Sequence, residues 1–593
     1  MKITWKNLFL VLTAACALSG LAACNTSEEQ PKHEHTPSAY SWDETSHKQK
    51  CDECNETLTE GRHVFTDGVC VCGYALVDDQ GLVYEYDAST ESYTVTGLQK
   101  PSATTIVIPE AWMNRPVTKI GEFAFSQSEL VKVSIPASIT EIGDNAFAVK
   151  NAVTSVNIFD LKAWFNISFG DAFANPMCNG GDLILNDGRV TDLTVPAGVT
   201  QVKDYVFAGC ESVTQLTVPE GVTSIGDSAF YQCENLEAIS LPASLKSAAS
   251  TAFGQCGKIA SIEVAAGNAN YRVENNCLIE TATGTLVRGC ANGAVPAGVT
   301  NIGDYAFSGC EALTSFTVPE TVTEIGSYAF SGTGLSAIKI PASVTELKHA
   351  AFLSCDLLED VQLTAGIVTI GSAAFAYCGK LTNIALPETL KTIGRCAFEH
   401  TGLTEITIPD GVEEIGEEGF VDCTALTKVT IGNGLKKIGN SAFEGCERLA
   451  GVYISDLAAW CGILFDGNRY SNPLWFAHNL YLNGAPVTEL TVPASIKEIP
   501  VRAFGNCTSI TSVVIESGVT KILGAAFEQC ANLQTVTIAA SVTAIGITAF
   551  ANCAKLEHIY FEGTRAQWDE IEKDVNWDGG SKAYTLYCSG DIS

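Results

Sequence analysis

One phrase recurs along most of this chain, and its spacing limits what the chain can fold into. It appears as "IGDSAFYQC", "IGDYAFSGC" and "IGNSAFEGC", and the phenylalanine of its Ala-Phe step returns every 22–23 residues. A unit of this length cannot bury its own apolar face and must stack on neighbouring copies. The period therefore predicts a repeat solenoid over residues 105–558.

Each unit contains two short extended runs and a turn. In residues 313–333, "SFTVP" alternates like a strand and ends at proline, "TVTEIG" is a second extended run that ends at glycine, and "SYAF" turns the chain back. Strands of successive units stack in register about 4.8 Å apart. The fold class expected is a leucine-rich-repeat-like stack of short parallel strands and turns.

The consensus of these units resembles a known family. Leu-x-x-Ile-x-Ile-Pro-x-x-Val-x-x-Ile-Gly-x-x-Ala-Phe is similar to the repeat of the BspA-like leucine-rich repeat surface (lipo)proteins, and the resemblance covers nearly all of residues 105–565. It implies a non-catalytic scaffold at the bacterial cell surface that adheres to host proteins or other cells. No ligand carries over, because no binding motif is visible.

A cysteine stands three residues after the phenylalanine in eleven units: Cys210, Cys233, Cys256, Cys310, Cys355, Cys378, Cys423, Cys446, Cys507, Cys530 and Cys553. In the three units that are one residue shorter, Ser128, Thr333 or Thr401 lies near that place. A nucleophile would not be repeated eleven times and exchanged for Ser or Thr. We expect a small buried side chain that closes each turn.

The N-terminus reads as an export signal. Lys2 and Lys6 precede an apolar run, and Leu21-Ala22-Ala23-Cys24 resembles the lipobox of bacterial lipoproteins, in which the cysteine carries the lipid. The alternative is an ordinary signal peptide in which Cys24 is incidental. Lipidation at Cys24 would tether the exported protein to the outer side of a membrane.

A small cysteine- and histidine-rich segment follows. Two cysteine pairs about sixteen residues apart resemble the knuckles of a zinc ribbon, and a segment this short needs metal or disulfides to fold. A structural Zn2+ ion is expected, with two disulfides or neither as the alternatives; no cofactor is expected in the repeats. The candidate ligands are Cys51, Cys54, Cys70, Cys72, His47 and His63.

These features divide the chain into six parts. They are a lipoprotein signal peptide (1–23), a lipid anchor and tether (24–46), the Cys/His module (47–75), a capping hairpin (76–104), the repeats (105–558) and a C-terminal cap (559–593). Insertions interrupt the repeats at 160–190, 264–290 and 456–489. The insertion at 264–290 is expected to bulge from the array as a hairpin.

The first and third insertions copy each other. Both begin with Asp-Leu-x-Ala-Trp, typical of an N-capped helical turn whose tryptophan packs inward, and both continue through Asn-Pro to a hairpin arm. The third adds "RYSNPLWF", whose Tyr470, Trp475 and Phe476 are candidate binding residues. The alternative is that the aromatic residues only pack.

Charge and motifs narrow the function. With 67 acidic and 35 basic residues the net charge is −32, which argues against nucleic acid as a partner. We expect no enzyme, because no catalytic motif occurs in a suitable context. The leading hypothesis is adhesion to an extracellular or host protein. The alternatives are a metal-handling lipoprotein that uses the Cys/His module and an architectural envelope protein.

Overall fold

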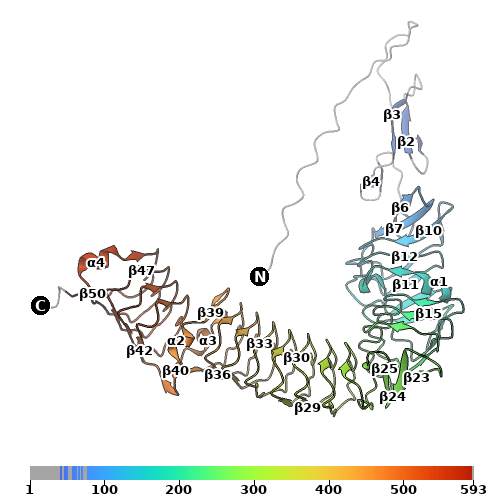
Figure 1. Ribbon diagram of the computed structural model, residues 1–593. Coiled ribbons are helices and arrows are strands. Elements are labelled where there is room, and N and C mark those ends of the chain that lie inside the picture. The colour runs from blue at the N-terminus through green and yellow to red at the C-terminus, as the bar shows by residue number, and fades with distance from the viewer. Residues whose placement is uncertain are drawn as a thin grey trace, which may run out of the picture.

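The computed structural model describes residues 41–42, 46–50, 57–62, 65–66, 69–70 and 77–589. In the N-terminal part, β1 (Ser41–Trp42), β2 (Ser46–Lys50) and β3 (Thr57–Arg62) form an antiparallel sheet. A small hairpin follows, made of β4 (Phe65–Thr66) and β5 (Val69–Cys70). All remaining elements belong to a solenoid (Figure 1).

Two rows of parallel strands run along the solenoid, one on each of two faces. The long-strand face comprises β8 (Thr105–Val107), β11 (Lys132–Ile135), β13 (Ser155–Ile158), β15 (Asp182–Leu185), β17 (Asp192–Thr194), β19 (Gln215–Thr217), β21 (Ala238–Leu241), β23 (Ser261–Val264), β29 (Ala337–Ile340), β31 (Asp360–Leu363), β34 (Glu405–Ile408), β36 (Lys428–Ile431), β38 (Gly451–Ile454), β40 (Leu480–Leu482), β42 (Glu489–Val492), β44 (Ser512–Ile515), β46 (Thr535–Ile538), β48 (His558–Phe561) and β50 (Thr585–Cys588).

The short-strand face has mostly two residues per turn, usually the isoleucine of the repeat's Ile-Gly step and the residue before it. Its strands are β10 (Arg115–Ile120), β12 (Glu141–Ile142), β14 (Ser168–Phe169), β18 (Gln201–Val202), β20 (Ser224–Ile225), β22 (Ser247–Ala248), β27 (Asn301–Ile302), β28 (Glu324–Ile325), β30 (Glu346–Leu347), β32 (Thr369–Ile370), β33 (Thr392–Ile393), β35 (Glu414–Ile415), β37 (Lys437–Ile438), β39 (Leu464–Phe465), β43 (Glu498–Ile499), β45 (Lys521–Ile522), β47 (Ala544–Ile545) and β49 (Glu572–Lys573).

The phenylalanine of each unit forms the spine of the core. Successive rings stack face to face, for example Phe307 on Phe330 with centroids 5.3 Å apart and Phe330 on Phe352 at the same spacing. This confirms the stacked, parallel repeat expected from the period. The ring ladder stops at Phe253 and restarts at Phe307, where the buried residues divide into two separate clusters.

The turn around Ala-Phe uses left-handed backbone twice. The residue before Ala-Phe and the residue four positions later both have positive φ, as at Tyr305 (57°) and Gly309 (75°). A non-glycine residue pays about 1 kcal/mol or more for this conformation. It is held because the turn bonds to the next one: Tyr305 N–H donates to the Ser327 carbonyl at 2.9 Å and Phe307 N–H to the Ala329 carbonyl at 2.7 Å.

The repeated cysteine closes its turn, as expected. In most units the buried thiol donates to the phenylalanine carbonyl of the preceding turn, for example Cys446 Sγ to the Phe420 carbonyl at 3.2 Å. In the shorter units the hydroxyl makes the corresponding bond within its own turn, as Thr333 Oγ1 does to the Phe330 carbonyl at 2.9 Å. Thr and Cys therefore satisfy the same backbone carbonyl from different turns.

Both ends of the array carry a different element. The hairpin expected over residues 81–97 is present as β6 (Leu82–Asp87) and β7 (Ser92–Leu98), and β7 pairs with β10; β9 (Ala111–Trp112) pairs with the other end of β10. At the other end α4 (Arg565–Glu570) has a capping box at Thr564 and buries Trp568. These elements cover the terminal turns.

The insertion at 264–290 does not bulge out as expected. It forms β24 (Tyr271–Glu274), β25 (Cys277–Glu280) and β26 (Thr285–Gly289), and β26 pairs with β27 as part of the short-strand face. Its side chains alternate between the two clusters of buried residues. Leu278 belongs to the first core, which spans Leu82 to Cys290, and Ile279 belongs to the second core, which spans Cys277 to Cys588. The hairpin is a wedge within the stack, because both of its faces are apolar.

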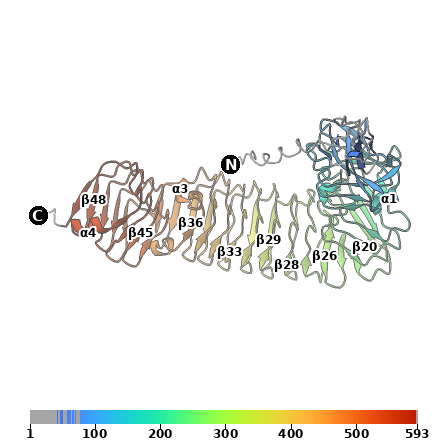
Figure 2. The same cartoon turned by 90° about the horizontal axis from the view of Figure 1, so that it is seen from above.

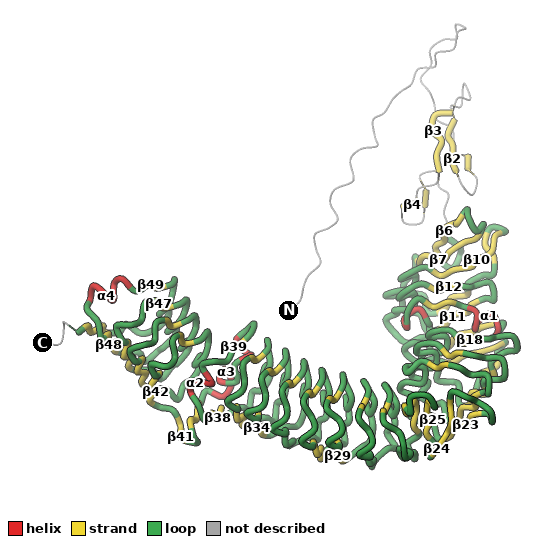
Figure 3. Tube along the Cα trace, in the orientation of Figure 1, coloured by secondary structure: helices red, strands yellow, loops and turns green. Residues whose placement is uncertain are grey.

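The array turns sharply at this wedge. Figure 1 shows the first part running from β6 down to β25 and the second part running across from β29 to β36. From above, the first part is seen nearly end-on while the second lies across the view (Figure 2). The long strands β29, β34 and β42 lie on the outer edge of the resulting arc (Figure 3).

Candidate functional site

The third insertion, residues 456–489, is fastened to the turn that follows it. Asp456 caps α2 (Leu457–Trp460) by accepting from the N–H groups of Ala458 and Ala459. Trp460 at the end of this helix is 1% exposed, and its Nε1–H donates to the Ala503 carbonyl at 3.1 Å. The inward packing expected for this tryptophan is confirmed.

A buried asparagine shapes the loop beyond the helix. Asn472 Nδ2 donates to the Arg502 carbonyl at 2.8 Å, and its Oδ1 accepts from Leu474 N–H at 2.9 Å. It lies between a 3-10 turn, η2 (Arg469–Ser471), and the short helix α3 (Leu474–Ala477). The chain then enters β40 and returns through β41 (Ala485–Pro486), the hairpin arm expected from the sequence.

This loop brings the three candidate aromatic residues together. The rings of Tyr470 and Phe476 stack with centroids 5.6 Å apart, and the Arg469 guanidinium lies 5.3 Å from the Tyr470 ring and 4.8 Å from the Trp475 ring. Tyr470, Trp475 and Phe476 are each half-buried and Arg469 is exposed. We call these four residues the aromatic patch. Arg469 was missed from sequence, although it directly precedes Tyr470.

The first insertion has the same framework. Asp160 caps α1 (Leu161–Asn166), Trp164 Nε1–H donates to the Val206 carbonyl at 2.9 Å, and Asn175 Nδ2 donates to the Tyr205 carbonyl at 2.7 Å. A 3-10 turn, η1 (Ala172–Ala174), and the hairpin of β15 with β16 (Gly188–Arg189) also match, whereas residues 176–179 form a turn in the place of α3.

The two insertions differ where the aromatic patch lies. Counting from the shared Asn-Pro step, Ala172 takes the place of Arg469 and Cys178 the place of Trp475. Since the first insertion keeps its helix, its buried tryptophan and its buried asparagine without them, Arg469 and Trp475 are not required to build this framework.

The candidate metal and lipid sites lie mostly outside the described residues. Cys24, Cys51, Cys54, Cys72 and His63 are not among them. His47 is a residue of β2 opposite Trp42, and Cys70 is a residue of β5 opposite Phe65. Over the residues whose side chains are described, no group of three potential metal ligands occurs.

Two buried cysteines of the repeats, Cys423 and Cys553, are poorly suited to act as nucleophiles. Burial raises the pKa of the Cys423 thiol to about 11 and that of Cys553 to about 12, so both stay protonated near neutral pH. No helix in the described ranges is long and apolar enough to span a membrane.

Solved structures similar to this chain are leucine-rich repeat proteins. A leucine rich cell surface protein from Faecalibacterium prausnitzii A2-165 is 24% identical over 66% of this chain and 98% of its own, with a TM-score of 0.38. A leucine-rich repeat protein from Bacteroides ovatus ATCC 8483 is 25% identical over 70% and 98%, with a TM-score of 0.32. The pneumococcal vaccine antigen PcpA is 16% identical over 74% and 93%, with a TM-score of 0.33.

No curated protein matches this chain. The model of the BspA type leucine rich repeat region does match, at residues 99–175, 184–285, 290–401, 347–462 and 476–574. These segments include the Ala-Phe turns and both strand rows, and together they span more than half of the sequence. The chain therefore belongs to the BspA type leucine-rich repeat family.

Proposed function

We propose that this protein binds another protein at the cell surface and that the aromatic patch is the centre of the contact. The observation that supports this proposal is the comparison of the first and third insertions. Both have the same framework, but only the third insertion presents Arg469 and Trp475. Trp, Tyr and Arg are the residues most enriched at interface hot spots. The partner is an extracellular or host protein.

The surroundings of the patch support a protein partner. Leu464, in the same insertion, is 60% exposed, so the insertion presents further apolar surface. Arg469 is held over two rings, an arrangement worth about 0.5–1 kcal/mol at an exposed site. A side chain positioned in this way loses little conformational freedom when a partner covers it.

The sequence supports export and anchoring as part of the same proposal. Lipid on Cys24 would hold the protein at the membrane surface, and residues 24–46 would serve as the tether. A structural Zn2+ ion in residues 47–75 would stabilise the module between the tether and the solenoid. The solenoid has no catalytic role in this proposal.

Exchange of residues between the insertions tests the patch. The double variant Arg469→Ala, Trp475→Cys gives the third insertion the residues of the first at these two positions. The assay is surface capture of the full chain on an array of extracellular matrix and host-surface proteins. We expect at least one specific partner for the natural chain and a loss of about thirtyfold in affinity for the double variant, the effect of removing about 2 kcal/mol of hot-spot energy.

The matched control is Ala172→Gly, Cys178→Ala in the first insertion, which should leave affinity unchanged. Both variants should keep the thermal unfolding midpoint of the natural chain within a few degrees. A partner bound equally well by the natural chain and by the Arg469/Trp475 variant would refute the patch as the contact centre.

A further inference from the structure

Two consecutive turns at the bend lack their long strand, as does the turn at residues 382–386 between β31 and β34. Between β23 and β29, residues 291–297 and 314–318 occupy the positions of strands without forming them. In the neighbouring turn, β29 pairs with β31 at four registered positions. By contrast, residues 315–318 make no backbone hydrogen bond within the described structure, and in this segment only the Thr314 carbonyl accepts one, from Ser336 N–H at 3.4 Å.

At the bend, two features accompany the missing strands; the turn at residues 382–386 lacks its strand with neither of them. Turning the stack separates the turns on its outer edge, where the long strands lie, while the short-strand face stays continuous from β26 to β39. Phe316 also occupies an inward position that holds Ile338 in the next turn. Its ring packs edge-on against Phe307 at 4.7 Å and Phe330 at 5.1 Å, so it needs more room than isoleucine.

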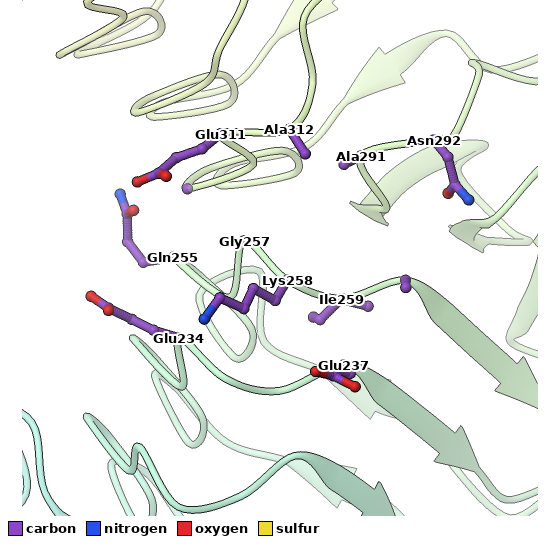
Figure 4. Close-up of a pocket in the computed structure, with 12 residues that line it drawn as sticks. Glu234, Glu237, Gln255, Gly257, Lys258, Ile259, Ala291, Asn292, Glu311 and Ala312 are labelled. Carbon is purple, nitrogen blue, oxygen red and sulfur yellow. The ribbon is translucent and has the colours of Figure 1, made fainter.

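Two hollows accompany the missing strands. One of about 600 Å³ lies over residues 314–317 and β29 and is lined by Phe316, Ile338 and Lys339 among others. The other, of about 910 Å³, lies where the two parts of the solenoid meet (Figure 4). Both are lined in part by residues 291–295, so they adjoin the same strandless stretch.

The larger hollow is acidic. Glu234, Glu237 and Glu311 line it, and none of the three forms an ion pair in the described part of the chain. Lys258 is the one basic residue among the described residues that line it, and its Nζ donates to Asn235 Oδ1 at 2.7 Å. The hollow therefore presents three carboxylates against one ammonium group.

We propose that this strandless stretch is a second binding site, which takes an extended, basic peptide segment of a partner protein. The segment hydrogen-bonds to the free backbone N–H and C=O groups of residues 315–318, as strands added to a sheet edge do. Its lysine or arginine side chains face Glu234, Glu237 and Glu311. The free backbone groups select an extended chain, and the carboxylates select its charge.

The occupant is chosen by charge complementarity. An acidic segment would place its carboxylates beside three others, and the chain as a whole carries a net charge of −32, which opposes binding of a second copy through this face. The site does not involve the aromatic patch, since it adjoins the insertion at 264–290, whereas the patch lies in the insertion at 456–489.

A designed peptide tests the proposal on the full chain. The probe is a twelve-residue peptide that alternates lysine and threonine, with two comparison peptides: one with glutamate in place of lysine, and one with backbone N-methylation at alternate residues. Fluorescence anisotropy measures affinity, and hydrogen exchange measures protection of amides 315–318. We expect the lysine peptide to bind and protect these amides, and the other two to bind at least about tenfold more weakly.

Variants separate this site from the acidic surface in general. Glu234→Gln, Glu237→Gln, Glu311→Gln should weaken the lysine peptide about tenfold. The matched control Glu388→Gln, Glu447→Gln, Glu489→Gln removes three exposed carboxylates elsewhere and should leave affinity unchanged. The Arg469→Ala, Trp475→Cys variant should also bind the peptide normally, whatever the fate of the first proposal.

Three results would overturn the inference. The first is peptide binding without protection of amides 315–318. The second is equal weakening by the two triple variants, which would mean diffuse attraction to an acidic surface. The third is protection of these amides by raising the protein concentration alone, which would make a second copy the occupant.

Discussion

Replacing Arg288 should uncouple the two halves of the solenoid. This side chain is 1% exposed and lies in β26, at the bend. Its guanidinium donates to the Cys256 carbonyl at 2.5 Å on one side, and to the carbonyls of Tyr305 at 2.9 Å and Ser308 at 3.2 Å on the other. Cys256 belongs to the first core, whereas Tyr305 and Ser308 belong to the first turn of the second.

The cost of Arg288→Met follows from the carbonyls it leaves behind. Tyr305 keeps other donors, because its carbonyl also accepts from the N–H and Oγ–H of Ser308. The Cys256 carbonyl keeps only a long bond from Ile259 N–H at 3.4 Å, and the Ser308 carbonyl loses its guanidinium donor. Two buried carbonyls that lose their main donors cost about 1–3 kcal/mol each, or about 2–6 kcal/mol of unfolding free energy together. Removing the buried guanidinium, whose Nε has no hydrogen-bond partner among the described residues, offsets part of this cost.

The assay is urea unfolding of the full chain together with hydrogen exchange. We expect the natural chain to unfold with the two parts coupled and Arg288→Met to unfold in two separate steps, with faster exchange first at turns 250–310. Arg272→Met is the matched control: Arg272 is a half-buried arginine of the same insertion with a 3.7 Å ion pair to the exposed Glu274, and its replacement should cost about 1 kcal/mol or less. Equal effects of the two substitutions would refute the assigned role.

Three further outcomes are expected. Burial raises the pKa of Cys423 from 9.0 to about 11, so above pH 9 the unfolded chain releases a proton that the folded chain keeps. Between pH 9 and 11 the unfolding free energy should therefore fall by about 1.4 kcal/mol per pH unit for each such thiol. Denaturant titrations that give the same unfolding free energy across this range would contradict this. Trp460→Ala should cost about 3–5 kcal/mol in the same titrations, clearly more than Trp475→Ala, whose side chain is half-buried. Metal analysis of the full chain after dialysis should find one tightly held zinc ion that Cys51→Ser releases. Cysteine thiols that react with a thiol reagent only after reduction would favour disulfides instead. Weak, exchangeable zinc binding would favour metal handling.

Local sequence patterns predicted much of the structure of the repeats. The Ala-Phe period predicted the stacked phenylalanine ladder, and the exchange of Cys446 or its equivalents for Thr333 predicted a buried, turn-closing side chain. The Asp-Leu-x-Ala-Trp step predicted a capped helix with Trp460 inside. Each of these depends on residues within one turn or on the copy in the next, and such short-range relations repeat in the sequence.

The same patterns failed where several turns meet. The strand expected in residues 313–333 is absent from "SFTVP", although its alternation equals that of β29. The hairpin at 264–290 was expected outside the array and lies within it. The short-range pattern could not show either, because the pairing of a strand and the place of a hairpin depend on how neighbouring turns are spaced and packed, as where Phe316 packs against the rings of Phe307 and Phe330.

The sequence by itself determined the unit, its stacking and the side chains that close each turn, because every unit repeats the same local physics. It also brought Tyr470, Trp475 and Phe476 forward as candidates. Only the tertiary structure decided that Arg469 joins them, that Arg288 holds two cores together, and that residues 315–318 keep free backbone groups. These depend on contacts between segments that no single unit contains, so they appear only once the turns are stacked.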